Sequence, residues 1–281
     1  MKIIKAEHSG TCFGVKKAIE IAFDNAEQKP NLYILGELVH NPYIANKLLS
    51  KGVQVIDDYK TLKEGDNLII RAHGEPKEVF WYCKKNNINT IDCTCPFVKR
   101  TQVIASQLQY EGYKVILVGD SNHPEVKGIA THTIDPIIVS NTDELNQDTL
   151  SNHKKIGVLS QTTQRKETFE NIVKNIVSNS RETKVFNTIC NATTNRQTAA
   201  IKLCDDVNMM IVIGGKNSAN TKQLNEICKK KVKTHWITKA EELRDEWFKG
   251  VDTIGITAGA STPESTIKEV VDTLKRINHR T

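Results

Sequence analysis

The sequence predicts an α/β fold made of three similar units with largely parallel sheets. Short apolar runs alternate with amphipathic segments along the chain, a pattern typical of parallel strands covered by helices. Polar turns of similar composition follow these runs, and their cysteines Cys12, Cys95 and Cys190 are 83 and 95 positions apart. Periods of that length indicate repeated domains, because solenoid repeats are much shorter.

The alternation places ten strands and several helices. The expected strands are Lys2–Ala6, Leu32–Leu35, Asn67–Ile70, Thr90–Asp92, Lys114–Val118, Lys155–Leu159, Lys184–Thr188, Asn208–Ile213, His235–Ile237 and Asp252–Ile256. The expected helices include Val15–Ala26, Asn41–Lys51, Val98–Tyr110, Lys166–Ser178, Arg196–Cys204 and Pro263–Ile277.

We expect the three units to lie around a pseudo-threefold axis. They comprise residues 14–95, 96–190 and 191–281, and the N-terminal strand within residues 1–13 joins the C-terminal unit. Ligands of open parallel sheets bind beyond the carboxyl ends of the strands, where the polar turns lie. Three such edges facing inward predict one central site.

Composition indicates a cytoplasmic protein. The 281 residues are 38% hydrophobic and 26% charged, which is ordinary for a soluble globular chain. The longest apolar run, Met209–Ile213, is far too short to span a membrane, and the N-terminus lacks the apolar core of a signal peptide. The net charge of +6 is mild and spread along the chain, so we expect neither nucleic acid nor membrane as a partner.

Seven cysteines are the unusual feature of the composition. In a reducing compartment they do not indicate a disulfide framework. Cys83, Cys204 and Cys228 fall in helix-like periodic stretches and are expected in the core. The remaining strand-end cysteines precede helices, whose N-termini favour thiolate over thiol.

Three converging thiolates would suit a metal centre of more than one kind. Structural zinc needs four ligands, usually in close pairs that this chain lacks, and catalytic zinc with three cysteines is chemically unusual. An iron–sulfur cluster with three thiolates would leave one iron open to bind a substrate oxygen as a Lewis acid. Spacing alone does not decide between Cys93 and Cys95 as the ligand of the middle unit.

The other turns supply groups for an anion and a proton. His40, His73 and His123 each follow a strand, and Ser218, Asn220 and Ser261 lie in turns whose amides can cradle phosphate oxygens. Because the chain has no P-loop and no dinucleotide fingerprint, we expect a small phosphorylated metabolite. Glu125, beside His123, is either the proton donor or an ordinary surface glutamate.

Motifs spread from one end of the chain to the other match those of a known protein family. The matching segments are Gly10–Gly14, Glu37–Asn41, Ala72–Gly74, Asp92–Val98, His123–Val126, Gln161–Thr163, Cys190–Gln197, Lys216–Asn220 and Thr257–Pro263. Together they resemble the LytB-type 4-hydroxy-3-methylbut-2-enyl diphosphate reductases, which end the non-mevalonate isoprenoid pathway.

The resemblance implies a cofactor, a reaction and a set of site residues. It implies one [4Fe–4S] cluster held by Cys12, Cys95 and Cys190, with one open iron, at the centre of the three units. It implies reductive dehydroxylation of the allylic diphosphate to isopentenyl and dimethylallyl diphosphates plus water, with Glu125 as the proton source acting through Thr162. The implied substrate contacts are His40, His73, His123, Thr162, Ser218, Asn220 and Ser261.

The chain departs from the family pattern at three positions. Ala219 stands where a second serine is common, Asn191 replaces a tyrosine common after the third cysteine, and Cys93 replaces a common alanine. None of these changes removes an implied ligand or the acid.

Electrons must come from outside, because the chain has no flavin or nicotinamide fingerprint. A small acidic carrier of the ferredoxin or flavodoxin type suits the net positive charge. Two other functions fit the residues alone: a non-redox hydro-lyase that would turn over without an electron donor, and a cluster-bearing redox sensor or nucleic-acid binder.

Overall fold

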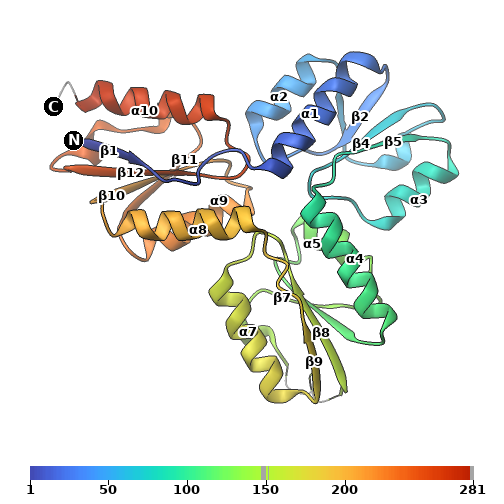
Figure 1. Cartoon of the computed structure of the whole chain (residues 1–281). Coiled ribbons are helices and arrows are strands. Elements are labelled where there is room, and N and C mark those ends of the chain that lie inside the picture. Colours follow the sequence, from blue (N-terminus) through green and yellow to red (C-terminus); the bar gives the residue numbers. More distant parts are fainter. Residues whose placement is uncertain (147–149, 151, 279–281) are drawn as a thin grey trace. The chain divides into compact units, whose positions relative to one another are not determined.

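The computed structural model describes residues 1–146, 150 and 152–278 and divides the chain into two compact units (Figure 1). Unit 1 comprises Met1–Val15, His40–Pro42 and Asn191–Thr281, and unit 2 comprises Lys16–Val39 and Tyr43–Cys190. Among the described residues, no helix combines the length and apolarity that crossing a membrane requires.

Three four-stranded sheets, all parallel, form the framework. The sheet of unit 1 has the order β1 (Lys2–Lys5), β12 (Thr253–Ala258), β10 (Met209–Ile213), β11 (Lys233–Ile237). The first sheet of unit 2 has the order β5 (Asn89–Asp92), β4 (Asn67–Ile70), β2 (Leu32–Leu35), β3 (Gln54–Ile56). The second has the order β9 (Glu182–Val185), β8 (Lys155–Ser160), β6 (Lys114–Val118), β7 (Ile137–Val139).

The principal helices lie between successive strands, except α10, which follows the last one. They are α1 (Phe13–Gln28), α2 (Pro42–Ser50), α3 (Lys77–Lys85), α4 (Pro96–Tyr110), α5 (Pro124–Ala130), α7 (Lys166–Asn179), α8 (Asn191–Cys204), α9 (Ala219–Lys229) and α10 (Glu264–Asn278). The fold class of three parallel-sheet α/β units is therefore confirmed.

Successive side chains of a strand point to opposite faces of the sheet, so each face packs against different helices. In unit 1, α10 lies on one face of the sheet and α8 and α9 lie on the other (Figure 1). Ile211 of β10 belongs to the apolar cluster that includes Leu274 of α10, whereas its neighbour Val212 belongs to the cluster that includes Leu203 of α8 and Leu224 of α9. The β6–β8 sheet is covered in the same way, by α7 on one face and by α4 and α5 on the other. Burial on both faces explains why the central strands read as unbroken apolar runs.

The edge strands β3 and β7 were not predicted from the sequence. Each has only three residues, which is too few to establish a periodic pattern, and β3 also exposes two of its three residues. The strand expected at Lys184–Thr188 is β9, at Glu182–Val185. Beyond it, the Thr188 hydroxyl bonds both the N–H and the carbonyl of Ser160, at 2.8 and 2.5 Å, and so replaces the backbone partner that a strand would provide.

Two expectations about chain segments have different outcomes. Cys83, Cys204 and Cys228 are buried in helices, which confirms their place in the core. The boundaries 14–95, 96–190 and 191–281 stay predictions, and so does the pseudo-threefold arrangement. The N-terminal strand β1 pairs with β12 in unit 1, from Lys2 with Thr253 to Lys5 with Ile256.

Candidate functional site

Each of the three predicted ligand cysteines directly precedes a helix. Cys12 comes before α1, Cys95 before α4 and Cys190 before α8. None of the three forms a disulfide, and their side chains are partly accessible. The Sγ atom of Cys12 also accepts a hydrogen bond from the Val15 N–H at 3.5 Å, as a residue that caps a helix N-terminus does.

The backbone fixes these cysteines in the same way in all three sheets. Each cysteine follows an edge strand, and its N–H donates to the second residue beyond the end of the neighbouring strand. The bonds are Cys12 N–H to Ala260 O (3.1 Å, beyond β12), Cys95 N–H to Ala72 O (2.9 Å, beyond β4) and Cys190 N–H to Thr162 O (3.0 Å, beyond β8). The three thiols therefore occupy equivalent positions at the carboxyl edges of their sheets.

The structure also separates Cys93 from Cys95. Cys93 is buried, and desolvation with the nearby charge of Asp92 raises the pKa of its thiol to about 12. A metal ligand must be a thiolate. Cys95, at the helix N-terminus and partly accessible, is the better donor of the two.

Glu125 is not a surface residue. It is the second residue of α5, is only 2% exposed, and accepts two hydrogen bonds from Thr162, from the N–H at 2.6 Å and from the hydroxyl at 2.9 Å. Burial raises the pKa of Glu125 to about 7, although both hydrogen bonds work in the opposite direction. Near neutral pH this carboxyl group can hold a proton and release it, as a general acid must.

Two of the predicted histidines lie beside this acid in unit 2. The rings of His73 and His123 meet edge to face with their centroids 5.3 Å apart. The Nδ1 atom of His123 caps α5 by accepting the Glu125 N–H at 3.1 Å. In a neutral ring the hydrogen is then on Nε2, so that nitrogen acts as a donor.

Unit 1 carries a second group, at the N-terminus of α9. Ser218 caps the helix by accepting the Thr221 N–H on its hydroxyl at 3.3 Å. Asn220 is 4% exposed, and neither polar atom of its amide has a hydrogen-bond partner among the residues that the structure describes. Buried amides are normally paired, so this side chain and the free N–H groups of the helix end fit an anionic ligand.

His40 and Ser261 join the same group through the backbone. The Ser261 hydroxyl donates to the His40 carbonyl at 3.1 Å, and the Asn41 amide donates to the Ser261 carbonyl at 2.5 Å. Gly215 lies against this segment so closely that an added Cβ would be 2.7 Å from the His40 oxygen. Unit 1 thus holds four of the predicted substrate contacts in one packed cluster: His40, Ser218, Asn220 and Ser261.

Two arginines had no role predicted from the sequence: Arg196, which is buried, and Arg71, which is half-buried. Arg196, on α8, donates to the Ala192 carbonyl at 2.8 Å and to the Gly10 carbonyl, so it fixes the turn that carries Cys12. Arg71 forms a two-point ion pair with buried Glu75, at either end of the turn that carries His73. Their signal in the sequence is only a charge close to a predicted ligand, because the partners are set by the fold.

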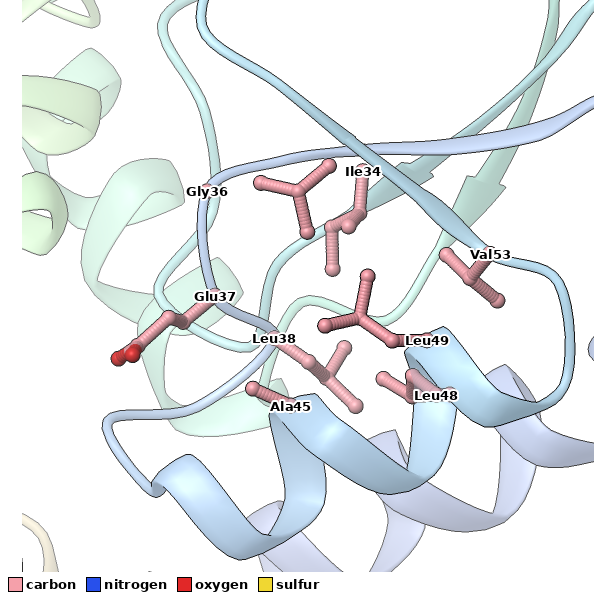
Figure 2. A pocket seen from close by; sticks show the side chains of 9 residues that line it. Ile34, Gly36, Glu37, Leu38, Ala45, Leu48, Leu49 and Val53 are labelled. Carbon is pink, nitrogen blue, oxygen red and sulfur yellow. The ribbon is translucent and has the colours of Figure 1, made fainter.

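The hollow between β2, β3 and α2 is a different kind of feature (Figure 2). Its lining is apolar apart from Glu37, and the residues that point into it include Ile34, Leu48 and Val53. None of the predicted site residues lines it. The candidate site residues lie on the polar turns of each unit and not in this hollow.

The family model for LytB protein matches residues 3–275. The chain belongs to the LytB family. The resemblance predicted from the sequence motifs is therefore confirmed, over nearly the whole chain.

Similar proteins carry one name. A relative from a Nitratiruptor species is 43% identical over 279 residues, covering 99% of each chain, and is named 4-hydroxy-3-methylbut-2-enyl diphosphate reductase. A relative of the same name from Caldanaerobacter subterraneus subsp. tengcongensis is 44% identical, covering 99% of this chain and 98% of its own.

Solved structures of LytB-family reductases are similar as well. One is a 4-hydroxy-3-methylbut-2-enyl diphosphate reductase described as the terminal enzyme of the non-mevalonate pathway; it is 42% identical, covers 98% of this chain and 100% of its own, and superposes with a TM-score of 0.71. The reductase from Plasmodium falciparum is 31% identical, covers 98% of this chain and 88% of its own, and has a TM-score of 0.92.

The raised pKa of Glu125 predicts a pH-dependent stability. A carboxyl group that titrates near 7 in the folded chain and at its ordinary value of 4.5 in the unfolded chain favours folding below both values, and this contribution is lost as pH rises through 7. We expect the unfolding free energy of the wild type, relative to Glu125→Gln, to fall by about 2.5 kcal/mol from pH 5 to pH 8 in urea titrations. The same comparison with Glu170→Gln, on the exposed face of α7, should show no such slope; equal slopes would contradict the buried acid.

Proposed function

We propose that this chain is a 4-hydroxy-3-methylbut-2-enyl diphosphate reductase. The reaction takes two electrons and two protons, breaks the C–O bond of the allylic alcohol, and gives isopentenyl or dimethylallyl diphosphate with water. The observation that carries the proposal is the buried Glu125–Thr162 pair, an acid whose pKa burial raises to about 7, in a chain of the LytB family. Family membership alone shows how the relatives are named, whereas this pair supplies an acid that can give a proton to the substrate.

The three equivalent cysteines are the proposed ligands of a [4Fe–4S] cluster. Cys12, Cys95 and Cys190 are thiols outside any disulfide, and the same backbone hydrogen bond places each of them before a helix. This donor set fits the group, because iron–sulfur clusters are held by thiolates and three of them leave one iron without a protein ligand. When bound, the cluster supplies low-potential electrons and an open iron that acts as a Lewis acid.

The proposed diphosphate contacts are neutral or cationic groups. His40, Ser218, Asn220 and Ser261 come from unit 1, and His73 and His123 from unit 2. The N-terminus of α9 adds a positive dipole end and free N–H groups, which suit phosphate oxygens. Imidazole rings, hydroxyl groups and an amide carry no negative charge, so these side chains do not repel a diphosphate.

The proton is proposed to travel from Glu125 through Thr162. While Glu125 is ionised, the Thr162 hydroxyl donates to Oε2 at 2.9 Å. When Glu125 is protonated the direction reverses, and the hydroxyl hydrogen becomes free to be given to the substrate hydroxyl. This step lets the leaving oxygen depart as water and not as hydroxide.

Glu125→Gln tests the reaction directly. The amide keeps the size of the side chain but removes the acid, so turnover with a small artificial reductant should fall by about 10²- to 10⁴-fold. Iron content and the affinity for inorganic diphosphate should stay at wild-type values, since other residues provide them. Glu170→Gln on α7 is the matched control. A Glu125→Gln enzyme with near wild-type turnover would falsify the proposed role.

The cluster assignment predicts which thiols matter. Serine at Cys12, Cys95 or Cys190 should remove the visible iron–sulfur absorption after anaerobic purification, together with bound iron and turnover. Serine at the core positions Cys83, Cys204 or Cys228 should leave the absorption largely intact. Loss of the cluster in Cys93→Ser with retention in Cys95→Ser would show that the ligand of the middle position is wrong.

The electron donor is proposed to be a small acidic carrier protein that docks near a cysteine. Helix α4 begins directly after Cys95, carries two cations and no acidic residue, and exposes Arg100, Val103 and Tyr110. Lys99 is partly neutralised by Asp92 at 2.6 Å, which leaves Arg100 as the stronger attraction. A basic surface with apolar side chains suits transient binding of ferredoxin or flavodoxin.

Salt and charge reversal test this docking. The rate with reduced ferredoxin should fall as ionic strength rises from about 0.01 to 0.15 M, because the Debye length shrinks from about 30 to 8 Å. Arg100→Glu should raise the KM for ferredoxin several-fold and leave turnover with a small artificial donor unchanged. Lys174→Glu makes the same charge change on α7, a helix that does not begin at a cysteine, and should behave as the wild type. A rate with ferredoxin that changes neither with salt nor with Arg100→Glu would exclude docking on α4.

A further inference from the structure

Trp236, on β11, makes three contacts with the turn that leads to Ser218. Its indole N–H donates to the Gly214 carbonyl at 2.8 Å. The Lys216 ammonium lies 4.6 Å from the centroid of the Trp236 ring and also donates to the Trp236 carbonyl at 2.5 Å. The turn of residues 214–217 is thus held at its first residue and again at its third.

This turn has little room to shift. Gly214 has a φ of +150°, and an added Cβ would lie 2.6 Å from the Thr221 hydroxyl. A Cβ at Gly215 would lie 2.7 Å from the His40 carbonyl. Glycine is required at both positions because the turn packs against α9 and against the segment that carries His40. Glycines are also the residues that lose most conformational freedom on ordering, so a turn with two of them needs outside contacts to stay in place.

The contacts of Trp236 are specific to one face of the sheet. Trp236 packs with the residues that α8 and α9 bury, whereas Trp247 packs on the opposite face, where its ring stacks on His235 at 3.9 Å. Trp247 therefore provides a tryptophan in the same unit that packs on the other face, against His235 and Phe248.

We propose that Trp236 and Lys216 are positioning residues that hold the turn 214–217 so that Ser218, Asn220 and the N-terminus of α9 are ready to bind a diphosphate. The inference rests on the proposed function for the identity of the ligand. The turn loses its conformational freedom when the chain folds. Its ordering therefore does not reduce the free energy of binding. Neither residue needs to touch the substrate.

Substitutions separate the indole hydrogen bond from the ring contact. Trp236→Phe keeps a ring under the ammonium and loses the N–H donor, so we expect the Kd for inorganic diphosphate in calorimetry to rise about fivefold, the equivalent of one net hydrogen bond. Trp236→Leu loses both contacts and Lys216→Met loses the ammonium, and the leucine variant should show the largest rise, about 20-fold. Trp247→Phe should match the wild type.

Kinetics distinguish positioning from general damage to the fold. In turnover assays the KM for substrate should rise in Trp236→Phe and rise most in Trp236→Leu, while kcat at saturation stays within about twofold of the wild-type value. A lower kcat with unchanged KM would indicate a smaller folded fraction and would overturn the proposal. Should Trp236→Leu fail to fold by circular dichroism, Trp236→Phe decides, and a wild-type Kd in that variant overturns the proposal.

The two hypotheses can fail separately. If the wild type binds diphosphate but turns over no substrate, the proposed function is wrong, and weaker diphosphate binding in the Trp236 variants would still support positioning. If the wild type turns over substrate and every Trp236 and Lys216 variant has an unchanged Kd and KM, the proposed function stands and the positioning role is wrong.

Discussion

The hydrogen bond from each cysteine N–H to the turn beyond the neighbouring strand is the constraint on which the candidate site depends. Parallel strands end at one edge of a sheet, so a residue just beyond one strand lies beside the turn of the next. In all three sheets this bond joins a cysteine to the second residue after the adjacent strand. One of these acceptors belongs to Thr162, which also holds Glu125, so a proposed ligand and the proposed acid share a single turn.

Much of the fold could be predicted because parallel strands buried on both faces leave a strong pattern. The inner strands β4, β6, β8 and β10 are apolar at nearly every position and were located to within a residue or so. The edge strands β3 and β7 have only three residues each, which is too few to establish a pattern, and β3 also exposes two of its three residues. The error at β9 has another origin. The N–H of Ser160 donates to the side-chain hydroxyl of Thr188 and not to a backbone carbonyl of an extended strand, and the hydrophobic pattern does not reveal this.

The site residues divide in the same way. A cysteine before a helix, or a histidine before a proline, is visible in the sequence because the feature is local. The character of Glu125 is not, because its pKa depends on burial and on Thr162, which lies 37 positions away. Arg196 and Trp236 were missed for the same reason, since each acts on a turn that is remote in the sequence. Long-range contacts decide whether a polar residue is a surface group or part of a site.

The repeated architecture explains how one local geometry serves two kinds of chemistry. His123 and Ser218 each stand five residues beyond a strand end and cap the helix that follows, and the second residue of that helix is buried: Glu125 in one case, Asn220 in the other. Desolvation at such a position raises the pKa of a carboxyl group into the neutral range, which makes it an acid. An amide at the equivalent position cannot ionise, so it presents donors and an acceptor at any pH without a charge. A carboxylate at position 220 would repel a diphosphate at the helix N-terminus, whereas an amide at position 125 would have no proton to release. The choice of side chain at this one repeated position therefore separates proton transfer from anion binding.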